Sequence, residues 1–288
     1  MKLKYIVDKE INIRQVLREK FGVSERLLTK LKKNKKIYLN GNNNIFLDMP
    51  VKSLDIVEVD FDFDEDNFNI VPVKMDLNVI YEDDSLIVLD KPFNMPVHPS
   101  LNHYEDSLSN GLKYYYDSIN LHRKIRPINR LDKDTSGIVI FAKNEYAQDR
   151  IRITNKIYLT ILEGKLEGSG TIDKPIARKA DSIIERCISD NGEKAITEYS
   201  VIKNFKIGNE EFSLVKCILH TGRTHQIRVH MASINHPILG DTLYGKSSVL
   251  IDRQALHSYK LTFVHPITKK EIEVTSPIPY DMNNIINK

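Results

Sequence analysis

The feature that most constrains this fold is a series of short β-forming runs between Leu77 and Lys288 that do not alternate regularly with helices. The candidate strands are residues 78–81, 86–90, 137–142, 158–163, 195–202, 212–219, 261–265 and 271–275, and the candidate helices are 107–117, 144–153 and 224–234. A doubly wound parallel sheet requires regular alternation, so it is disfavoured. We therefore expect an α+β domain with a central mixed, largely antiparallel sheet.

A reversal of charge separates this region from the N-terminal part of the chain. Residues 1–36 hold 12 Lys or Arg against 4 Asp or Glu, a local charge of 12 − 4 = +8. Residues 55–66 then hold seven acidic residues and no basic one. Such a reversal is typical of a boundary between domains. We predict an N-terminal domain over residues 1–60, a linker over 61–76 and a larger domain over 77–288.

The N-terminal part has the pattern of two short helices followed by a small β-ribbon. Apolar residues first fall at helical spacing between Ile13 and Phe21. Ser24 can then cap a second helix whose inner face carries Leu27, Leu28 and Leu31, and this helix leads into a run of lysines. Strand-like pieces at residues 37–39 and 56–59 complete a small αβ unit.

The basic run in this unit allows two interpretations. It can be a solvated helix end, where cations complement the helix dipole, or it can contact RNA. The order of a helix, a Ser-Glu-Arg turn, a basic helix, KKIYLNGN and LDIVEV resembles the S4 RNA-binding domain over roughly residues 12–60. The resemblance implies that the basic helix and the following loop bind structured RNA through backbone charge and shape. The candidate contacts are Arg14, Arg26, Lys30 and Lys33.

Composition limits the class of protein without selecting one. The net charge is +3 and the pI near 8.6, so binding to nucleic acid requires a local patch. Cys187 and Cys217 are too few for a disulfide framework or a four-thiolate zinc site. The first residues lack the apolar core of a signal peptide, and no apolar run approaches the ~18 residues that span a bilayer. We expect a cytoplasmic protein without a membrane partner.

The first segment that can carry chemistry is residues 126–141, RPINRLDKDTSGIVIF. It passes from charged residues into a run of apolar β-formers, which places Asp132 in a loop just before a buried strand. Arg130 and Lys133 would favour the ionised form of this carboxylate. Taken alone, such a segment is more often a loop whose Asp and Thr side chains make turn hydrogen bonds.

The second segment is residues 219–236, LHTGRTHQIRVHMASINH, which carries several histidines. Thr224 can cap a helix, with Arg228 on its first turns. Five residues on a helix rotate a side chain by about 140°, so His225 and His230 do not share a face. Neither Cys217 nor His220 supplies the usual ligand spacing for zinc. We therefore expect no metal site.

The third segment is residues 156–164, KIYLTILEG, a strand with Tyr158 near its start. Taken alone, Tyr158 is more often a half-buried core tyrosine than a site residue.

Together, RLDKDTSG, KIYLTILEG and TGRTHQIRVH resemble, in order and approximate spacing, the motifs of RNA pseudouridine synthases of the large-subunit ribosomal RNA type. The likeness covers residues 77–280 and includes LDKPFNMPVHPS, DKPIARK, GEKAITEYSVI, HPILGDTLYG and ALHSYKLTFVHPITKKEIEVTSPIP. It implies an isomerase that converts uridine to pseudouridine in structured RNA, 23S ribosomal RNA above all, by flipping out the base and without a metal or cofactor. The resemblance does not give the oligomeric state, for which we expect a monomer.

The resemblance also implies roles for individual residues. Asp132 corresponds to the catalytic aspartate, Tyr158 to the tyrosine that packs against the target base, and Arg228 to the arginine that pairs with the aspartate. Arg130 corresponds to the residue that enters the base stack vacated by the flipped nucleotide. The candidate RNA contacts in this domain are Arg130, Arg223 and His225.

Two positions depart from the family pattern. Asn129 stands where the family usually has His, and Phe93-Asn94 stand where it usually has small residues and a Gly. These departures put RNA specificity in question more than activity. Three alternative functions stay open from the sequence: a synthase directed at transfer RNA, an RNA-binding or ribosome-assembly factor that has lost the reaction, and a metal-dependent hydrolase built on the histidines.

Overall fold

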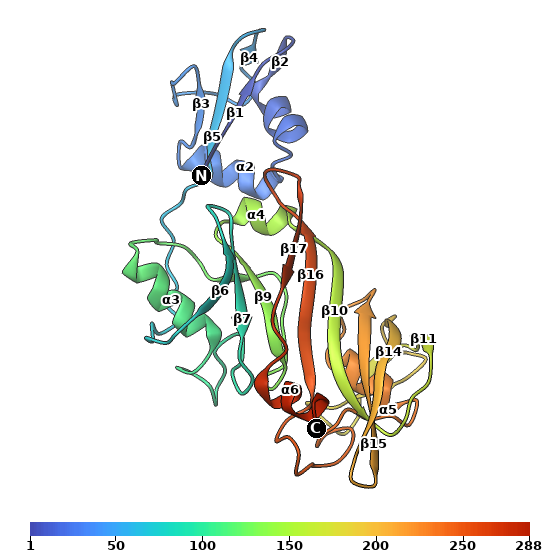
Figure 1. The fold of residues 1–288 in the computed structure, drawn as a ribbon. Helices are drawn as coiled ribbons and strands as arrows, with labels where there is room; N and C mark the ends of the chain where they lie inside the picture. The colour runs from blue at the N-terminus through green and yellow to red at the C-terminus, as the bar shows by residue number, and fades with distance from the viewer.

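A ten-stranded mixed sheet forms the body of the structure, a computed structural model that describes residues 1–288 (Figure 1). Its strands run in the order β11-β14-β15-β10-β16-β9-β7-β6, with β17 beside β16 and β8 beside β9. Every pairing is antiparallel except that of β16 with β9. The expected mixed, largely antiparallel sheet is therefore confirmed. The strands are β6 Asn78–Glu82, β7 Leu86–Lys91, β8 Arg126–Pro127, β9 Ser136–Ala142, β10 Arg152–Glu163, β11 Ser169–Asp173, β14 Ile196–Ile207, β15 Glu210–Leu219, β16 Leu256–Val264 and β17 Glu271–Thr275.

Four helices and a short hairpin surround this sheet. The helices are α3 Leu108–Ser118, α4 Glu145–Arg150, α5 Gln226–Ala232 and α6 Tyr280–Ile286, and the hairpin pairs β12 Ile176–Arg178 with β13 Arg186–Ile188. Strand β9 is buried along its whole length, as its run of apolar residues predicts for a central strand. None of the helices combines the length and apolar character that crossing a lipid bilayer requires.

The N-terminal unit is a separate small sheet packed against helices. Its strands pair in the order β1-β5-β3, with β1 at Lys2–Ile6, β5 at Ile56–Asp60 and β3 at Ile37–Leu39. The other elements are β2 Ile11–Asn12, α1 Ile13–Gln15, the π-helical turn η1 Val16–Lys20, α2 Glu25–Lys33 and β4 Pro50–Val51. Ser24 caps α2 by accepting a hydrogen bond from the backbone N–H of Leu27, and Leu27, Leu28 and Leu31 face the core, as predicted.

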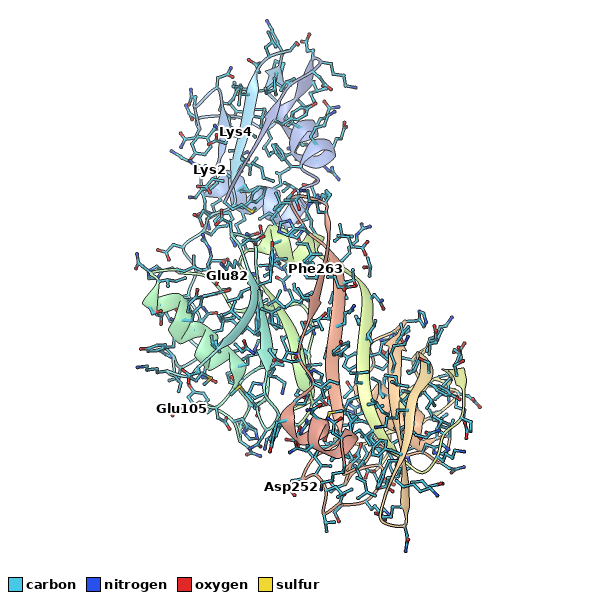
Figure 2. All side chains as sticks on the ribbon, in the orientation of Figure 1. Lys2, Lys4, Glu82, Glu105, Asp252 and Phe263 are labelled. Atoms are coloured by element: carbon cyan, nitrogen blue, oxygen red, sulfur yellow. The ribbon has the colours of Figure 1, made fainter.

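The two units pack directly on one another. Tyr146 of α4 belongs to the core of the N-terminal unit, and its hydroxyl donates to the backbone oxygen of Phe21 at 2.9 Å. Phe61 and Phe63 are also buried there, so the N-terminal core extends into the first residues of the expected 61–76 linker. Figure 2 shows the length of the molecule, with Lys2 and Lys4 in the N-terminal unit and Asp252 at the opposite end of the larger unit.

Several predicted boundaries shift because pairing overrides local propensity. The helix expected over 144–153 ends at Arg150, because Ile151 is extended and Arg152 pairs with Val264 of β16. Strand β16 begins at Leu256 instead of 261, since its first residues pair with β9. Thr224 does not cap α5. His225 occupies the cap position, in a left-handed conformation with φ 58°, and makes no side-chain cap hydrogen bond.

Candidate active site

Asp132 lies in the loop between β8 and β9, and neighbouring side chains fix the shape of this loop. Asn129 donates to the backbone oxygen of Ile138 and accepts from the N–H of Ile140, both at 2.9 Å, so it ties the loop to β9. The backbone N–H of Thr135 donates to the backbone oxygen of Asp132 at 3.1 Å and closes a turn. The Asp132 side chain is 29% exposed and can therefore meet a substrate.

Lys91, the last residue of β7, also supports this loop. This fully buried side chain donates to the backbone oxygens of Pro92, Met95 and Lys133 at 2.7 to 2.9 Å. Burial lowers the pKa of Lys91 to about 7, although Asp134 and Asp132 nearby favour its charged form. Lys91 thus holds the backbone next to Asp132 to the segment that follows β7.

Arg228 joins Asp132 to a second carboxylate. From α5, its Nη1 lies 3.4 Å from Oδ2 of Asp132, while Nε and Nη2 donate to Asp241 at 2.7 and 2.8 Å. Burial works to lower the pKa of Arg228, but the hydrogen bonds and charge of Asp241 outweigh it and raise the pKa. The side chain of Asp241 is fully buried. The guanidinium is therefore held in one orientation and presents its remaining edge to Asp132.

Tyr158 forms a wall of the same cleft from β10. It is 8% exposed and packs in the main hydrophobic core. Burial raises the pKa of its hydroxyl to about 12, so the group stays protonated at neutral pH. A ring held in this way offers a flat face to a planar base.

His225 lies beside Asp132 and is itself held in place. Its Nδ1 is 2.9 Å from the hydroxyl of Tyr244, and its Nε2 is 3.8 Å from Oδ2 of Asp132. Burial lowers the pKa of His225, the charge of Arg228 acts in the same direction, and Asp132 opposes them. The neutral ring is thus favoured, and His225 lies beside the Asp132 carboxylate as an uncharged polar group.

The cleft around Asp132 opens into a groove of about 740 Å³. Besides Asp132, Tyr158 and His225, four cationic side chains line it: Arg130, Lys133, Lys156 and Arg223. Arg130 is exposed at its edge. A groove with one carboxylate on its floor and several cations along its walls suits a polyanion.

The other predicted RNA contacts are engaged within the protein to different degrees. Arg223 pairs with Glu193 and donates to the backbone oxygen of Lys194, so it braces the loop before α5. Lys30 pairs with Glu65 and Glu145 at the junction of the two units. Arg14 lies 3.2 Å from Asp48 and Arg26 lies 3.6 Å from Glu145, while Lys33 is exposed at the end of α2. Of this set, Lys30 is the least available to a ligand.

The structure brings together Asp132, Tyr158 and Arg228 and adds two residues that the sequence did not single out. Asp241 lies in the segment HPILGDTLYG, where one acidic residue among apolar neighbours is the only local signal. Lys91 lies at the end of an apolar strand, where a buried cation is rare. The His side chains also find separate partners: His230 contacts Thr197 and the backbone oxygen of Lys174.

Both departures from the family pattern have a local explanation. Asn129 makes the two backbone hydrogen bonds that tie the Asp132 loop to β9. Asn94 adopts a positive φ of 56°, a conformation that favours Gly and that Asn tolerates better than most residues. The Phe93 ring lies 4.8 Å from the guanidinium carbon of Arg253, a buried arginine that also donates to the backbone oxygen of Asp134.

Comparison with known proteins shows the family to which this chain is related. The family model for RNA pseudouridylate synthase matches residues 85–233, a range that includes Asp132, Tyr158 and Arg228. The chain is 35% identical over 273 residues to the uncharacterized RNA pseudouridine synthase YjbO of Bacillus subtilis, covering 92% of this chain and 95% of that protein. It is 38% identical over 226 residues to the ribosomal large subunit pseudouridine synthase D of Vibrio cholerae, covering 72% and 68% of the two chains.

Solved structures show the same fold. Human RNA pseudouridylate synthase domain containing 1 superposes with a TM-score of 0.58 at 26% identity, over 71% of this chain and 84% of that chain. Human RNA pseudouridylate synthase domain containing 4 gives a TM-score of 0.57 at 21% identity, over 73% and 92%, and shows likeness of fold alone. The chain therefore belongs to the RNA pseudouridylate synthase family and is an RNA pseudouridine synthase.

Proposed function

We propose that this enzyme isomerises uridine in the 23S RNA of the large ribosomal subunit, with Asp132 as its catalytic residue. The observation that carries the proposal is the placement of the Asp132 carboxylate 3.4 Å from Arg228, in a cleft that Tyr158 also lines. We expect the enzyme to act as a monomer in the cytoplasm. No metal or cofactor takes part in the proposed reaction.

The reaction exchanges one bond for another on the same ribose. The bond between C1′ and N1 breaks, the uracil turns within the site, and a new bond forms between C1′ and C5. The proton on C5 is then lost to solvent, and N1 gains one, so the product is an isomer of the substrate. A carboxylate can assist by attacking C1′ or by stabilising positive charge on the sugar as the base departs. Asp132 is the carboxylate placed for either path.

The neighbours of Asp132 supply positioning. Arg228 is held by Asp241 and keeps the Asp132 carboxylate oriented through a charge-assisted contact. Tyr158 packs its ring against the uracil, since it is fixed in the core and lines the cleft. Arg130, exposed at the edge of the cleft, enters the space that the flipped nucleotide leaves in the RNA. Such contacts offset the free energy that unstacking a base costs, a few kcal/mol.

Two observations support ribosomal RNA as the target. Relatives with 34 to 38% identity are named ribosomal large subunit pseudouridine synthase D. The N-terminal unit, with its capped basic helix α2 followed by β3, has the order of elements expected of an S4-like RNA-binding domain. We propose that this unit binds ribosomal RNA while the groove beside Asp132 receives the target nucleotide.

The test is tritium release from RNA labelled at uridine C5, with 23S ribosomal RNA and transfer RNA as parallel substrates. Wild-type protein should release tritium from 23S RNA, and Asp132→Asn should bind that RNA yet release none above background. Asp134→Asn, two residues away in the same loop, is the matched control and should retain turnover. Release from transfer RNA alone would overturn the ribosomal assignment, and turnover by Asp132→Asn near the wild-type rate would overturn the catalytic one.

A further inference from the structure

A second groove lies where the N-terminal unit meets the catalytic unit. It encloses about 530 Å³ and is bounded on one side by residues 22–24 and Leu27 of the N-terminal unit. On the other side it is bounded by α4, the start of β10 and the turn between β16 and β17. Figure 1 shows α2, α4 and this turn meeting at the waist of the molecule. We call it the junction groove.

Three basic side chains line the junction groove without an acidic partner. No ion pair with a carboxylate is formed by Arg150, Arg152 or Lys269. Arg150 donates to the backbone oxygen of Gly22, and Lys269 donates to that of Pro266 at 2.6 Å. Burial lowers the pKa of Lys269, and the charges of Arg150 and Arg152 lower it further, so the three cations lie within electrostatic reach of one another. Their mutual repulsion is a cost that a bound anion would remove.

Several basic residues of the N-terminal helices are, by contrast, paired with carboxylates. Lys30 and Arg26 pair with Glu145, and Arg18 pairs with Glu25. The one acidic side chain on the wall of the junction groove is Asp149, which leaves a local excess of positive charge. The junction groove therefore carries three cations against one carboxylate.

The junction groove and the active site share a strand. Strand β10 carries Arg152 at its start and Tyr158 six residues later, a distance of about 20 Å at roughly 3.3 Å per residue. In Figure 2, Phe263 marks the junction end of the catalytic unit, and Asp252, next to the Arg253 that supports the catalytic loop, marks the other end. A structured RNA that places a uridine at Asp132 is large enough to reach the junction groove as well.

We propose that the junction groove binds a backbone phosphate of the substrate RNA, about 20 Å from the target uridine. Phosphate is the anion that RNA presents at every nucleotide, and Arg and Lys are its usual ligands. This assignment rests on the proposed function, because it takes the RNA in the groove to be the RNA that is modified. It adds to the catalytic cleft a contact that ties both units to one substrate.

The test compares the salt dependence of RNA binding in two doubly substituted proteins of equal charge. The first is Arg152→Gln with Lys269→Gln, which leaves the structural contacts of Arg150 intact. The control is Lys165→Gln with Lys206→Gln, two lysines exposed at the far end of the catalytic unit. Full-length proteins bind transcribed, unmodified 23S RNA over a range of salt concentrations, and thermal denaturation checks that each variant folds.

The groove variant should make the slope of log affinity against log salt shallower by about 0.7 to 0.9, the loss of one neutralised phosphate. The control should leave the slope near that of wild type. An unchanged slope in the groove variant, or an equal change in both variants, would overturn the proposal. Failure of the proposed function is separate, because it is read from tritium release by the wild-type protein and not from this slope.

Discussion

The guanidinium of Arg228 donates two hydrogen bonds to the carboxylate of Asp241, at 2.7 and 2.8 Å. Both side chains are buried, and such a bidentate pair fixes the plane of the guanidinium as well as its position. The weaker contact of Arg228 with Asp132, at 3.4 Å, therefore depends on a partner that never meets the substrate. On the proposed mechanism, Asp241 would be a positioning residue for the Asp132 carboxylate.

The first prediction concerns Asp241→Asn. The substitution removes the charge of the buried carboxylate that holds Arg228 by two hydrogen bonds, which should lower the free energy of unfolding by about 3 to 5 kcal/mol. In the protein that remains folded, kcat for tritium release should fall by about 100-fold, because Arg228 no longer holds Asp132 in place. KM should change much less, since RNA contacts lie elsewhere in the groove.

Asp252→Asn is the matched control for this experiment. Asp252 is exposed and forms no ion pair, so its substitution should change the free energy of unfolding by less than about 0.5 kcal/mol and leave kcat at the wild-type value. A wild-type kcat for folded Asp241→Asn would contradict the prediction, because turnover would then not depend on the pairing of Arg228 with Asp241.

The second prediction concerns the pH dependence produced by Lys91. Its pKa is about 7 in the folded protein, because of burial, and near 10.5 in the unfolded chain. Between these values the unfolded chain binds more protons, so stability should rise with pH, at most by about 1.4 kcal/mol per pH unit. Lys91→Met removes the titrating group and should flatten this rise, and Lys206→Met, at an exposed site, should not. Chemical denaturation at pH 7 to 10 measures the free energy of unfolding of the wild-type protein and of both variants.

The third prediction concerns Glu65, which connects the two units. Burial works to raise the pKa of Glu65, but hydrogen bonds from Lys30 and Arg126 outweigh it and hold the pKa below the ordinary 4.5. Its contribution to stability is therefore fully present above pH 4.5 and is lost as pH falls through the folded pKa. Glu65→Gln should cost about 3 kcal/mol or more at neutral pH, because Arg126 is 8% exposed and loses its carboxylate.

The control for Glu65→Gln is Glu167→Gln. Glu167 pairs with Lys165 at the surface, where an ion pair contributes about 0 to 1 kcal/mol. Thermal denaturation at pH 7 and limited proteolysis of residues 66–76 report on the two variants. Equal stability of the two, with no added cleavage in Glu65→Gln, would contradict a role for Glu65 at the junction.

The fold was predictable where periodicity is local. The apolar run of β9 and the leucines of α2 each indicate both an element and its buried face. The start of β16 was not predictable, because His257 and Ser258 are polar and join the sheet through pairing with β10 and β9, both far away in the chain. The end of α4 was missed for the same reason, since pairing with β16 draws the chain into β10 directly after Ile151.

In the candidate site, too, some residues were predictable from the sequence and others were not. Asp132, Tyr158 and Arg228 were named through the resemblance of three segments, and the structure places them around one cleft. Their supports were not named, because no spacing in the sequence links Asp241 to Arg228. The support given by Lys91 was not named either. Its three hydrogen-bond acceptors are backbone oxygens, which every residue type has, so the sequence does not identify them.

The parallel pairing of β16 with β9 brings together residues made at very different times during synthesis. Ser136 and His257 are 121 positions apart, and Asp132 and Arg228 are 96 apart. Contacts so distant in sequence close slowly, because a long loop must be ordered before they form. A growing chain can therefore complete its N-terminal unit long before Asp132 and Arg228 come together, so the cleft around Asp132 is a part of the molecule that forms late.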